Sequence, residues 1–161
     1  VHPMLLKKAK DAVRQGLDEL PSETGDVAIF FCDMVNFTNI AEYKKHDQVV
    51  DLLNLALGVA VRGVERNGGS VEKIMGDALM AVFQNPLAAV IAAVEIQNNF
   101  QQLNGFRELS GLDPIHLRVG IHQGQVIFGN VGTPDRMDWT AISDAVKTAT
   151  RIEKNSASGE K

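Results

Sequence analysis

The stretch Val27-Ala28-Ile29-Phe30-Phe31-Cys32-Asp33 is an unbroken apolar run that ends in an acidic residue. β-Branched and aromatic residues are enriched in strands, and a continuous apolar run is typical of a strand that is covered on both faces. We therefore predict a central strand over 27–32. Asp33 then lies where a buried strand ends, and a carboxylate at such a place must be solvated, hydrogen-bonded or bound to a cation.

A second aspartate occupies a similar place, in Lys73-Ile74-Met75-Gly76-Asp77-Ala78. Residues 70–74 and 78–83 are predicted strands, and the glycine between them permits the backbone geometry of a tight turn. This pattern places Asp77 at the tip of a hairpin. If Asp33 and Asp77 converge, they form a site for Mg²⁺ or Mn²⁺, which prefer oxygen ligands and share their coordination with substrate phosphates.

The composition limits the classes of function. A chain of 161 residues is long enough for one domain with a substantial core. The net charge of −4 excludes a broad basic surface for nucleic acid. The single cysteine, Cys32, allows no disulfide within the chain, which favours a cytoplasmic location. The most apolar stretch, 87–96, is shorter than the roughly 20 residues that cross a bilayer.

Residues 4–20 show apolar residues at helical spacing with charged residues between them, and Pro21 ends the pattern. We interpret 1–25 as an amphipathic connector helix with a short polar link, and 26–161 as the main domain. Two roles for the helix stay open, packing on its own domain or dimerising and carrying a signal. The parent protein could then have a sensor or membrane domain upstream.

The remaining elements are predicted from periodicity and from turn residues. Residues 47–66 form a helix that ends at Asn67-Gly68-Gly69, and Asn85-Pro86 opens a helix to about 103. Further along the chain the pattern predicts a strand over 115–121, a turn at Gln123-Gly124, a strand over 126–131, a polar loop over 132–139 and a helix over 144–154. This order favours an α+β fold with a ferredoxin-like βαββαβ core, an appended β-hairpin and a helix.

The last predicted helix has a basic face. Lys147, Arg151 and Lys154 share one side, and Ala145, Ala149 and Ile152 supply an apolar side. From the pattern alone a solvated face is the favoured interpretation, and a clamp for an anion is the alternative.

Four segments together resemble the catalytic domain of class III nucleotide cyclases. They are Phe-Cys-Asp-Met-Val-Asn-Phe-Thr at 31–38, Val-Glu-Lys-Ile-Met-Gly-Asp-Ala-Leu-Met-Ala at 71–81, Arg-Val-Gly-Ile-His-Gln-Gly at 118–124, and Gly-Asn-Val-Gly at 129–132 followed by Arg-Met-Asp-Trp-Thr at 136–140. The resemblance covers about 26–152. It implies a homodimer, or a pseudo-dimer, whose active sites lie at the interface and are built from both chains.

The resemblance assigns roles to the residues of the first two segments. Asp33 and Asp77 match the two metal-binding aspartates of the family, with the backbone of Met34 assisting, and the family uses two Mg²⁺ or Mn²⁺ ions in each active site. Phe37 and Thr38 lie in the loop that would offer amides to the triphosphate.

Three further residues match substrate and catalytic positions. Lys73 and Thr140 occupy the positions that read the purine from the other protomer, where adenylate cyclases place lysine with threonine or aspartate and guanylate cyclases place glutamate and cysteine. A lysine can donate to adenine N1 and a threonine hydroxyl can accept from the exocyclic amine, so ATP is favoured over GTP. Arg151 matches the arginine that stabilises charge on the transferring phosphoryl group.

The chain also departs from the family pattern. Lys147 stands where the family has an asparagine that orients the ribose, Ser143 and Asn36 stand where glycines are usual, and closing strands with a further phosphate-contacting lysine would be expected beyond Lys161. A lysine has no acceptor and cannot reproduce the hydrogen bonding of an amide.

Two functions follow from the resemblance. The first is an adenylate cyclase that converts ATP to 3′,5′-cyclic AMP and pyrophosphate. The second is a degenerate module that dimerises and binds nucleotide for regulation. Because both aspartates, Lys73, Thr140 and Arg151 are retained, catalysis is favoured.

Overall fold

The computed structural model describes residues 10–11, 14–15, 23–133 and 136–156, with backbone alone for 23, 130–133 and 136–140. The elements are β1 (Glu23–Met34), α2 (Phe37–Tyr43), α3 (His46–Arg66), β2 (Ser70–Met75), β3 (Ala78–Phe83), α4 (Pro86–Leu109), β4 (Leu117–Thr133), β5 (Arg136–Ile142) and α5 (Asp144–Ser156). The predicted helix over 4–20 lies mostly outside the described residues.

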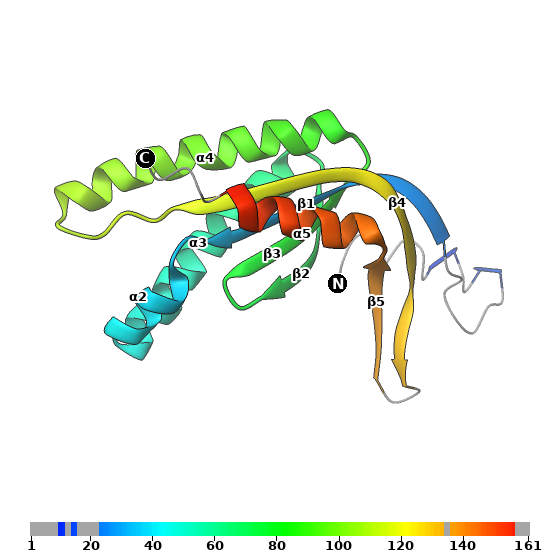
Figure 1. Cartoon of the computed structure of the whole chain (residues 1–161), viewed down its shortest axis with the longest axis horizontal. Coiled ribbons are helices and arrows are strands. Elements are labelled where there is room, and N and C mark those ends of the chain that lie inside the picture. Colours follow the sequence, from blue (N-terminus) through cyan, green and yellow to red (C-terminus); the bar gives the residue numbers. More distant parts are fainter. Residues whose placement is uncertain (1–9, 12–13, 16–22, 134–135, 157–161) are drawn as a thin grey trace.

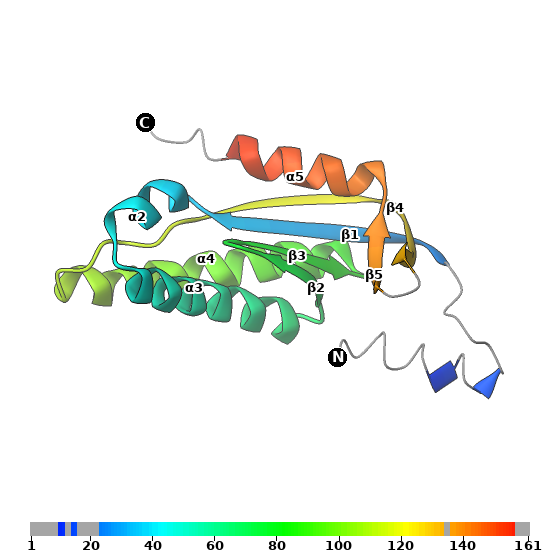
Figure 2. The same ribbon diagram turned by 90° about the horizontal axis from the view of Figure 1, so that it is seen from below.

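The strands form one antiparallel sheet in the order β2-β3-β1-β4-β5. Helices α3 and α4 lie on one face of this sheet and α5 lies on the other (Figures 1 and 2). The order of the first four strands is that of a ferredoxin-like core, with β5 and α5 appended. The predicted α+β fold is therefore confirmed.

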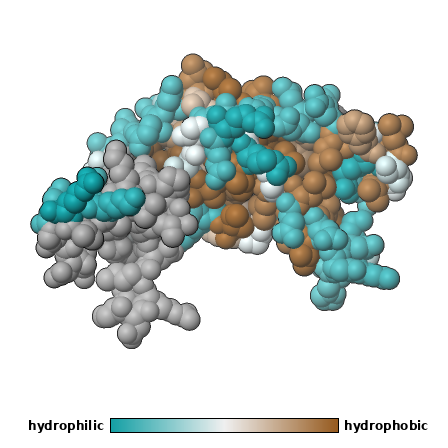
Figure 3. Space-filling model, turned by 180° about the vertical axis from the view of Figure 1, so that it is seen from behind, coloured by the Kyte–Doolittle hydropathy of each residue, from teal (hydrophilic) through white to brown (hydrophobic). Residues whose placement is uncertain are grey.

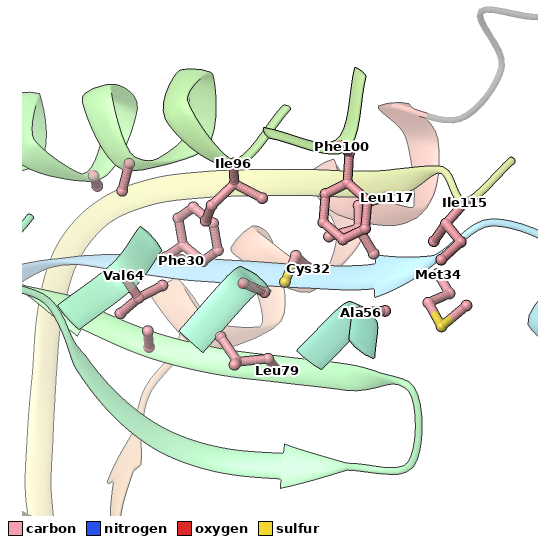
Figure 4. Close-up of a cluster of buried hydrophobic side chains, with 14 of the residues drawn as sticks. Phe30, Cys32, Met34, Ala56, Val64, Leu79, Ile96, Phe100, Ile115 and Leu117 are labelled. Atoms are coloured by element: carbon pink, nitrogen blue, oxygen red, sulfur yellow. The ribbon is translucent and has the colours of Figure 1, made fainter. Parts of the chain in front are cut away.

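The side chains of β1 alternate between the two faces of the sheet. Phe30, Cys32 and Met34 pack with α3 and α4 in one buried cluster (Figure 4), whereas Ile29 and Phe31 belong to a second cluster under α5. Successive residues of a strand point to opposite faces. The residue after Cys32 therefore points toward α5, at the end of the strand.

The prediction for residues 115–139 was wrong in two respects, and the first is that the chain does not turn at Gln123-Gly124. β4 is one long curved strand that pairs with β1 along 117–128 and with β5 along 127–133 (Figure 1). Gly124 faces Ala145, and a Cβ added to Gly124 would lie 2.9 Å from the Ala145 Cβ. The glycine thus makes room for α5. The second is that the described residues of the predicted polar loop, 132–133 and 136–139, belong to the paired strands β4 and β5.

Two smaller corrections concern helices. Phe37 and Thr38, expected in a loop, begin the short helix α2, whose Phe37 and Ile40 pack against the main core. Two inward residues are too few to produce a recognisable period. α4 begins as predicted, with the Asn85 side chain accepting a hydrogen bond from the Leu87 amide at 3.0 Å, but it continues to Leu109.

Apolar side chains also remain on the surface. Figure 3 views the face that carries α3 and α4, and apolar atoms gather where α4 runs. Leu87, Val90, Ile91 and Val94 are all about half exposed or more. In the part of the chain that the structure describes, no helix has the length and hydropathy needed to cross a bilayer.

Candidate active site

Asp33 and Arg118 form a bidentate ion pair at one end of the sheet. Arg118 lies directly opposite Asp33 on β4, and its Nε and Nη2 atoms donate hydrogen bonds of 2.8 and 2.7 Å to the two carboxylate oxygens of Asp33. The Asp33 side chain is 15% exposed. The carboxylate is therefore largely buried and compensated by a cation, as the sequence pattern required.

Asp77 lies beside this pair, on the β2–β3 turn. Gly76 adopts a positive φ of 62° in the turn, which glycine does without steric cost. Burial raises the pKa of Asp77, the negative charge of Asp33 raises it further, and the backbone amide of Met34 opposes the rise. The two aspartates thus converge within electrostatic reach, and the Met34 amide is close to the Asp77 carboxylate. Carboxylate oxygens so arranged suit a hard divalent cation, and the residues present fit such an ion.

The turn after β1 leads directly from Asp33 into α2. Asn36 has a φ of 57°, in the left-handed region that glycine favours and asparagine tolerates. The asparagine in place of the family's glycine is therefore compatible with this turn. Phe37 and Thr38 are the first two residues of α2, directly after this turn.

The residues predicted to contact the base lie on the two edge strands. Lys73 is on β2 opposite Met80, whose buried side chain belongs to the cluster under α5, so Lys73 faces the same side of the sheet as Asp33. Thr140 is on β5 opposite Gly129, and its side chain lies outside the described atoms. β2 and β5 are the two edge strands of the sheet, so no strand pairing joins these two residues.

α5 presents its basic residues to solvent, as the pattern predicted. The Lys147 side chain is 82% exposed and pairs at 3.3 Å with Asp144, and Arg151 is also exposed. The prediction of an apolar face was wrong at one position. Ile152 is 39% exposed, and the third buried residue of the helix is Glu153. The inward face follows the spacing of Ala145, Ala149 and Glu153 along the helix.

Glu153 and Arg118 were not identified from the sequence. Glu153 reaches from α5 to the ion pair, with its Oε1 at 3.0 Å from Arg118 Nε. Burial and contact with Asp33 together raise the pKa of Glu153 to about 7, and the positive charge of Arg118 opposes the rise. One sequence signal could have identified Glu153 as an inward residue, because it follows Ala145 and Ala149 at positions i, i+4 and i+8 of one helix face.

A groove lies at the start of α5. It has a volume of about 660 Å³ and is lined by β4, β5 and α5 residues that include His122, Ile142, Ser143 and Lys147. The size is within the usual range for small-ligand pockets, roughly 300 to 1,000 Å³. Two departures from the family pattern, Ser143 and Lys147, therefore line the same groove.

Residues 20–160 match the family described as "Adenylate and Guanylate cyclase catalytic domain". A terminal-differentiation-specific adenylate cyclase of Dictyostelium discoideum is 38% identical over 136 residues, 80% of this chain and 6% of that protein. An adenylate cyclase of Anabaena cylindrica is 34% identical over 148 residues, 86% of this chain and 30% of that protein. The chain thus spans a minor part of both relatives.

Solved structures agree with the fold. The adenylyl cyclase CyaB from P. aeruginosa superimposes with a TM-score of 0.80 at 28% identity, over 85% of this chain and 75% of that chain. The guanylyl cyclase Cya2 superimposes with a TM-score of 0.77 at 27% identity, over 84% and 73% of the two chains. Both substrate types therefore occur among similar structures.

Proposed function

Because the chain belongs to the adenylate and guanylate cyclase catalytic domain family, we propose that it converts ATP to 3′,5′-cyclic AMP and pyrophosphate as a homodimer. The observation that carries the proposal is the convergence of Asp33 and Asp77 at one end of the sheet. Relatives named adenylate cyclase, at 38% and 34% identity, support the choice of product class.

Asp33 and Asp77 would hold Mg²⁺ or Mn²⁺, and Met34 would contribute its backbone. Such ions activate a hydroxyl nucleophile and neutralise charge on phosphate oxygens. Phe37 and Thr38, at the start of α2, would orient the triphosphate through their amides. Arg118 is the guanidinium next to both carboxylates, so it would meet a phosphate that approaches them.

The position of Arg151 supports an active site shared between two chains. Glu153 points toward its own Asp33, and a helix rotates by about 200° over two residues, so Arg151 points away from that aspartate. Lys147 likewise faces outward. We infer that Arg151, Lys147, Lys73 and Thr140 serve the aspartates of the other protomer, and that Arg151 stabilises charge on the transferring phosphoryl group.

The decisive experiment is an assay of cyclic nucleotide formation from ATP and from GTP, with Mg²⁺ and with Mn²⁺. We expect cyclic AMP from the native chain, and a loss of at least about 100-fold in Asp33→Asn and Asp77→Asn. Asp26→Asn is the matched control, because Asp26 is an exposed aspartate on the same strand and should leave the rate unchanged. Equal rates in Asp33→Asn and in the native protein would contradict the proposal.

The preference for ATP rests on Lys73 and Thr140. The double variant Lys73→Glu with Thr140→Cys should lose most of its turnover of ATP and gain turnover of GTP, since the lysine donor and threonine acceptor that complement adenine are removed. The ratio of kcat/KM for the two nucleotides measures this change. An unaltered ratio would show that other residues select the base.

A regulatory module without turnover is the second candidate, favoured by Lys147 in place of the family's asparagine. Lys147→Asn separates the two functions. A native chain that binds ATP without product, together with a Lys147→Asn variant that forms cyclic AMP, would support the regulatory module. Turnover in the native chain would identify Lys147 as compatible with catalysis.

A further inference from the structure

Glu153 is the one buried charged residue among those that the structure describes, with 1% of its surface exposed. Burying a carboxyl group is unfavourable unless it is paired or hydrogen-bonded, and an alanine here would simply continue the inward series of Ala145 and Ala149. The packing is close as well, because a Cβ on Gly120 would overlap the backbone of Ala149 and Glu153. This close packing brings the glutamate against the active-site end of β4.

The hydrogen bonds of Arg118 leave Glu153 incompletely satisfied. Arg118 Nε donates to Asp33 Oδ1 at 2.8 Å, although Glu153 Oε1 lies only 3.0 Å from the same nitrogen. Within the described part of the chain, Glu153 Oε1 has no hydrogen-bond partner. Two carboxyl groups therefore flank one N–H donor, and only Asp33 receives its hydrogen bond.

This arrangement has a direct consequence for a nucleotide-bound site, and the argument rests on the proposed function. If Asp33 were to hold a metal ion through its carboxylate oxygens, Arg118 would lose its hydrogen-bond acceptor. Glu153 Oε1 is already within hydrogen-bonding distance of Nε, so the guanidinium can change acceptor without leaving the site. Without Glu153, Arg118 would extend toward solvent, since its side chain is already 24% exposed.

We propose that Glu153 is a positioning residue, which holds Arg118 at the metal end of the sheet after Asp33 is released, so that the guanidinium faces the triphosphate. The juxtaposition of Asp33, Arg118 and Glu153 from β1, β4 and α5 carries this proposal. Glu153 acts through Arg118 and does not itself contact the nucleotide.

The test measures binding of Mn²⁺-pyrophosphate and of Mn²⁺ with a non-cyclisable ATP analogue, by titration calorimetry on the full chain. Glu153→Ala should weaken the binding of both ligands by roughly tenfold, about the effect of one charge-assisted hydrogen bond. Glu153→Gln should retain most of the affinity, since the amide oxygen can still accept from Nε. In steady-state assays the KM for ATP should rise in Glu153→Ala more than kcat falls.

Controls separate positioning from folding. Glu95→Ala removes a carboxylate that pairs with Arg66 at 2.8 Å on the other layer, and it should leave pyrophosphate binding unchanged. The effect of Glu153→Ala should largely disappear in an Arg118→Ala background, as expected for two residues that act as a unit. Thermal melting of each variant identifies any that do not fold, and the glutamine variant keeps the test valid if the alanine variant fails.

Two results would overturn the inference. One is a folded Glu153→Ala variant that binds both ligands with unchanged affinity while Arg118→Ala binds them weakly. This result would exclude a positioning role for Glu153 and leave the proposed function intact. The other is a fully additive effect of the two alanine substitutions. If the native chain itself binds neither ligand, the proposed function fails first.

Discussion

At the scale of single residues, the glycines of β4 determine how closely α5 approaches the sheet. Gly120 and Gly124 both lie on the α5 face, and neither has room for a Cβ. The absence of these side chains lets Glu153 reach Arg118, while an ordinary strand would hold the helix further away. Gly124, which was predicted at a turn, and Gly120, which was predicted within a strand, are therefore both packing residues.

Gly120→Ala should destabilise the fold by about 3 kcal/mol, because the added methyl group would overlap the α5 backbone and force α5 away from β4. Gly105→Ala is the matched control, since Gly105 lies within α4 and a Cβ there meets nothing within 4 Å. That substitution should stabilise the helix by about 0.5 to 1 kcal/mol. Urea denaturation measures both values, and a neutral Gly120→Ala would contradict the packing argument.

Cys32 should be chemically inert in the folded protein. Its thiol is 1% exposed, and burial together with the negative charges of Asp33 and Glu153 raises its pKa to about 12. Because the raised pKa keeps the thiol protonated, alkylation by iodoacetamide should stay slow from pH 7 to pH 9. In urea the thiol should react at the rate of a free cysteine, with its usual pKa near 8.5. Rapid alkylation of the native protein would contradict this.

At the scale of elements, the sequence predicted some features well and others not at all. The apolar run of β1 and the cap of α4 by Asn85 are local signals, and both were predicted correctly. The single long strand β4 was missed because Gly124 serves a contact with Ala145, which no local window contains. Asp33 and Arg118 are 85 positions apart, so their pairing depends on strand register that spacing cannot give.

The β2–β3 hairpin sets the position of Asp77 through Gly76. Gly76→Ala should lower the free energy of unfolding by about 1 kcal/mol, because alanine is strained at a φ of 62°, and it should weaken Mn²⁺ binding by moving Asp77. Gly76→Asn should retain both properties, since asparagine tolerates this conformation.

Gly68→Ala provides the control for the hairpin. Gly68 has a φ of 78° and, like Gly76, an open space around its Cβ position, but it ends α3, away from the aspartates. The Gly68→Ala variant should lose about as much stability as Gly76→Ala and should keep the Mn²⁺ affinity of the native protein. If Gly76→Ala and Gly68→Ala bind Mn²⁺ equally, the turn does not control the metal site.

At the scale of the whole molecule, the two faces of the sheet are covered unequally. α3 and α4 form a layer on one face, whereas α5 alone lies on the other, where its basic residues and Ile152 are exposed. A second chain that approaches this less covered face would bring its own Lys147 and Arg151 toward Asp33 and Asp77.

Ile152→Glu should therefore weaken dimerisation and reduce activity per chain by at least tenfold, since a charged side chain would be buried at the interface. Leu87→Glu is the matched control, because Leu87 is 63% exposed on α4, on the opposite face. Sedimentation and activity should both be measured as a function of protein concentration. A dimer disrupted by Leu87→Glu and unaffected by Ile152→Glu would place the interface on the other face.

In the ion pair between Arg118 and Asp33, the guanidinium of Arg118 acts as a counter-ion for the acidic site. Many small metal-binding domains unfold when the ion is withdrawn, because binding of the ion supplies their free energy of folding. Here a protein cation already neutralises Asp33. A chelator should therefore abolish turnover, and the Tm of the metal-free domain should differ from that of the metal-bound domain by less than about 2 °C. A domain with this property can lose and regain its metal ions as their concentration changes without passing through an unfolded state.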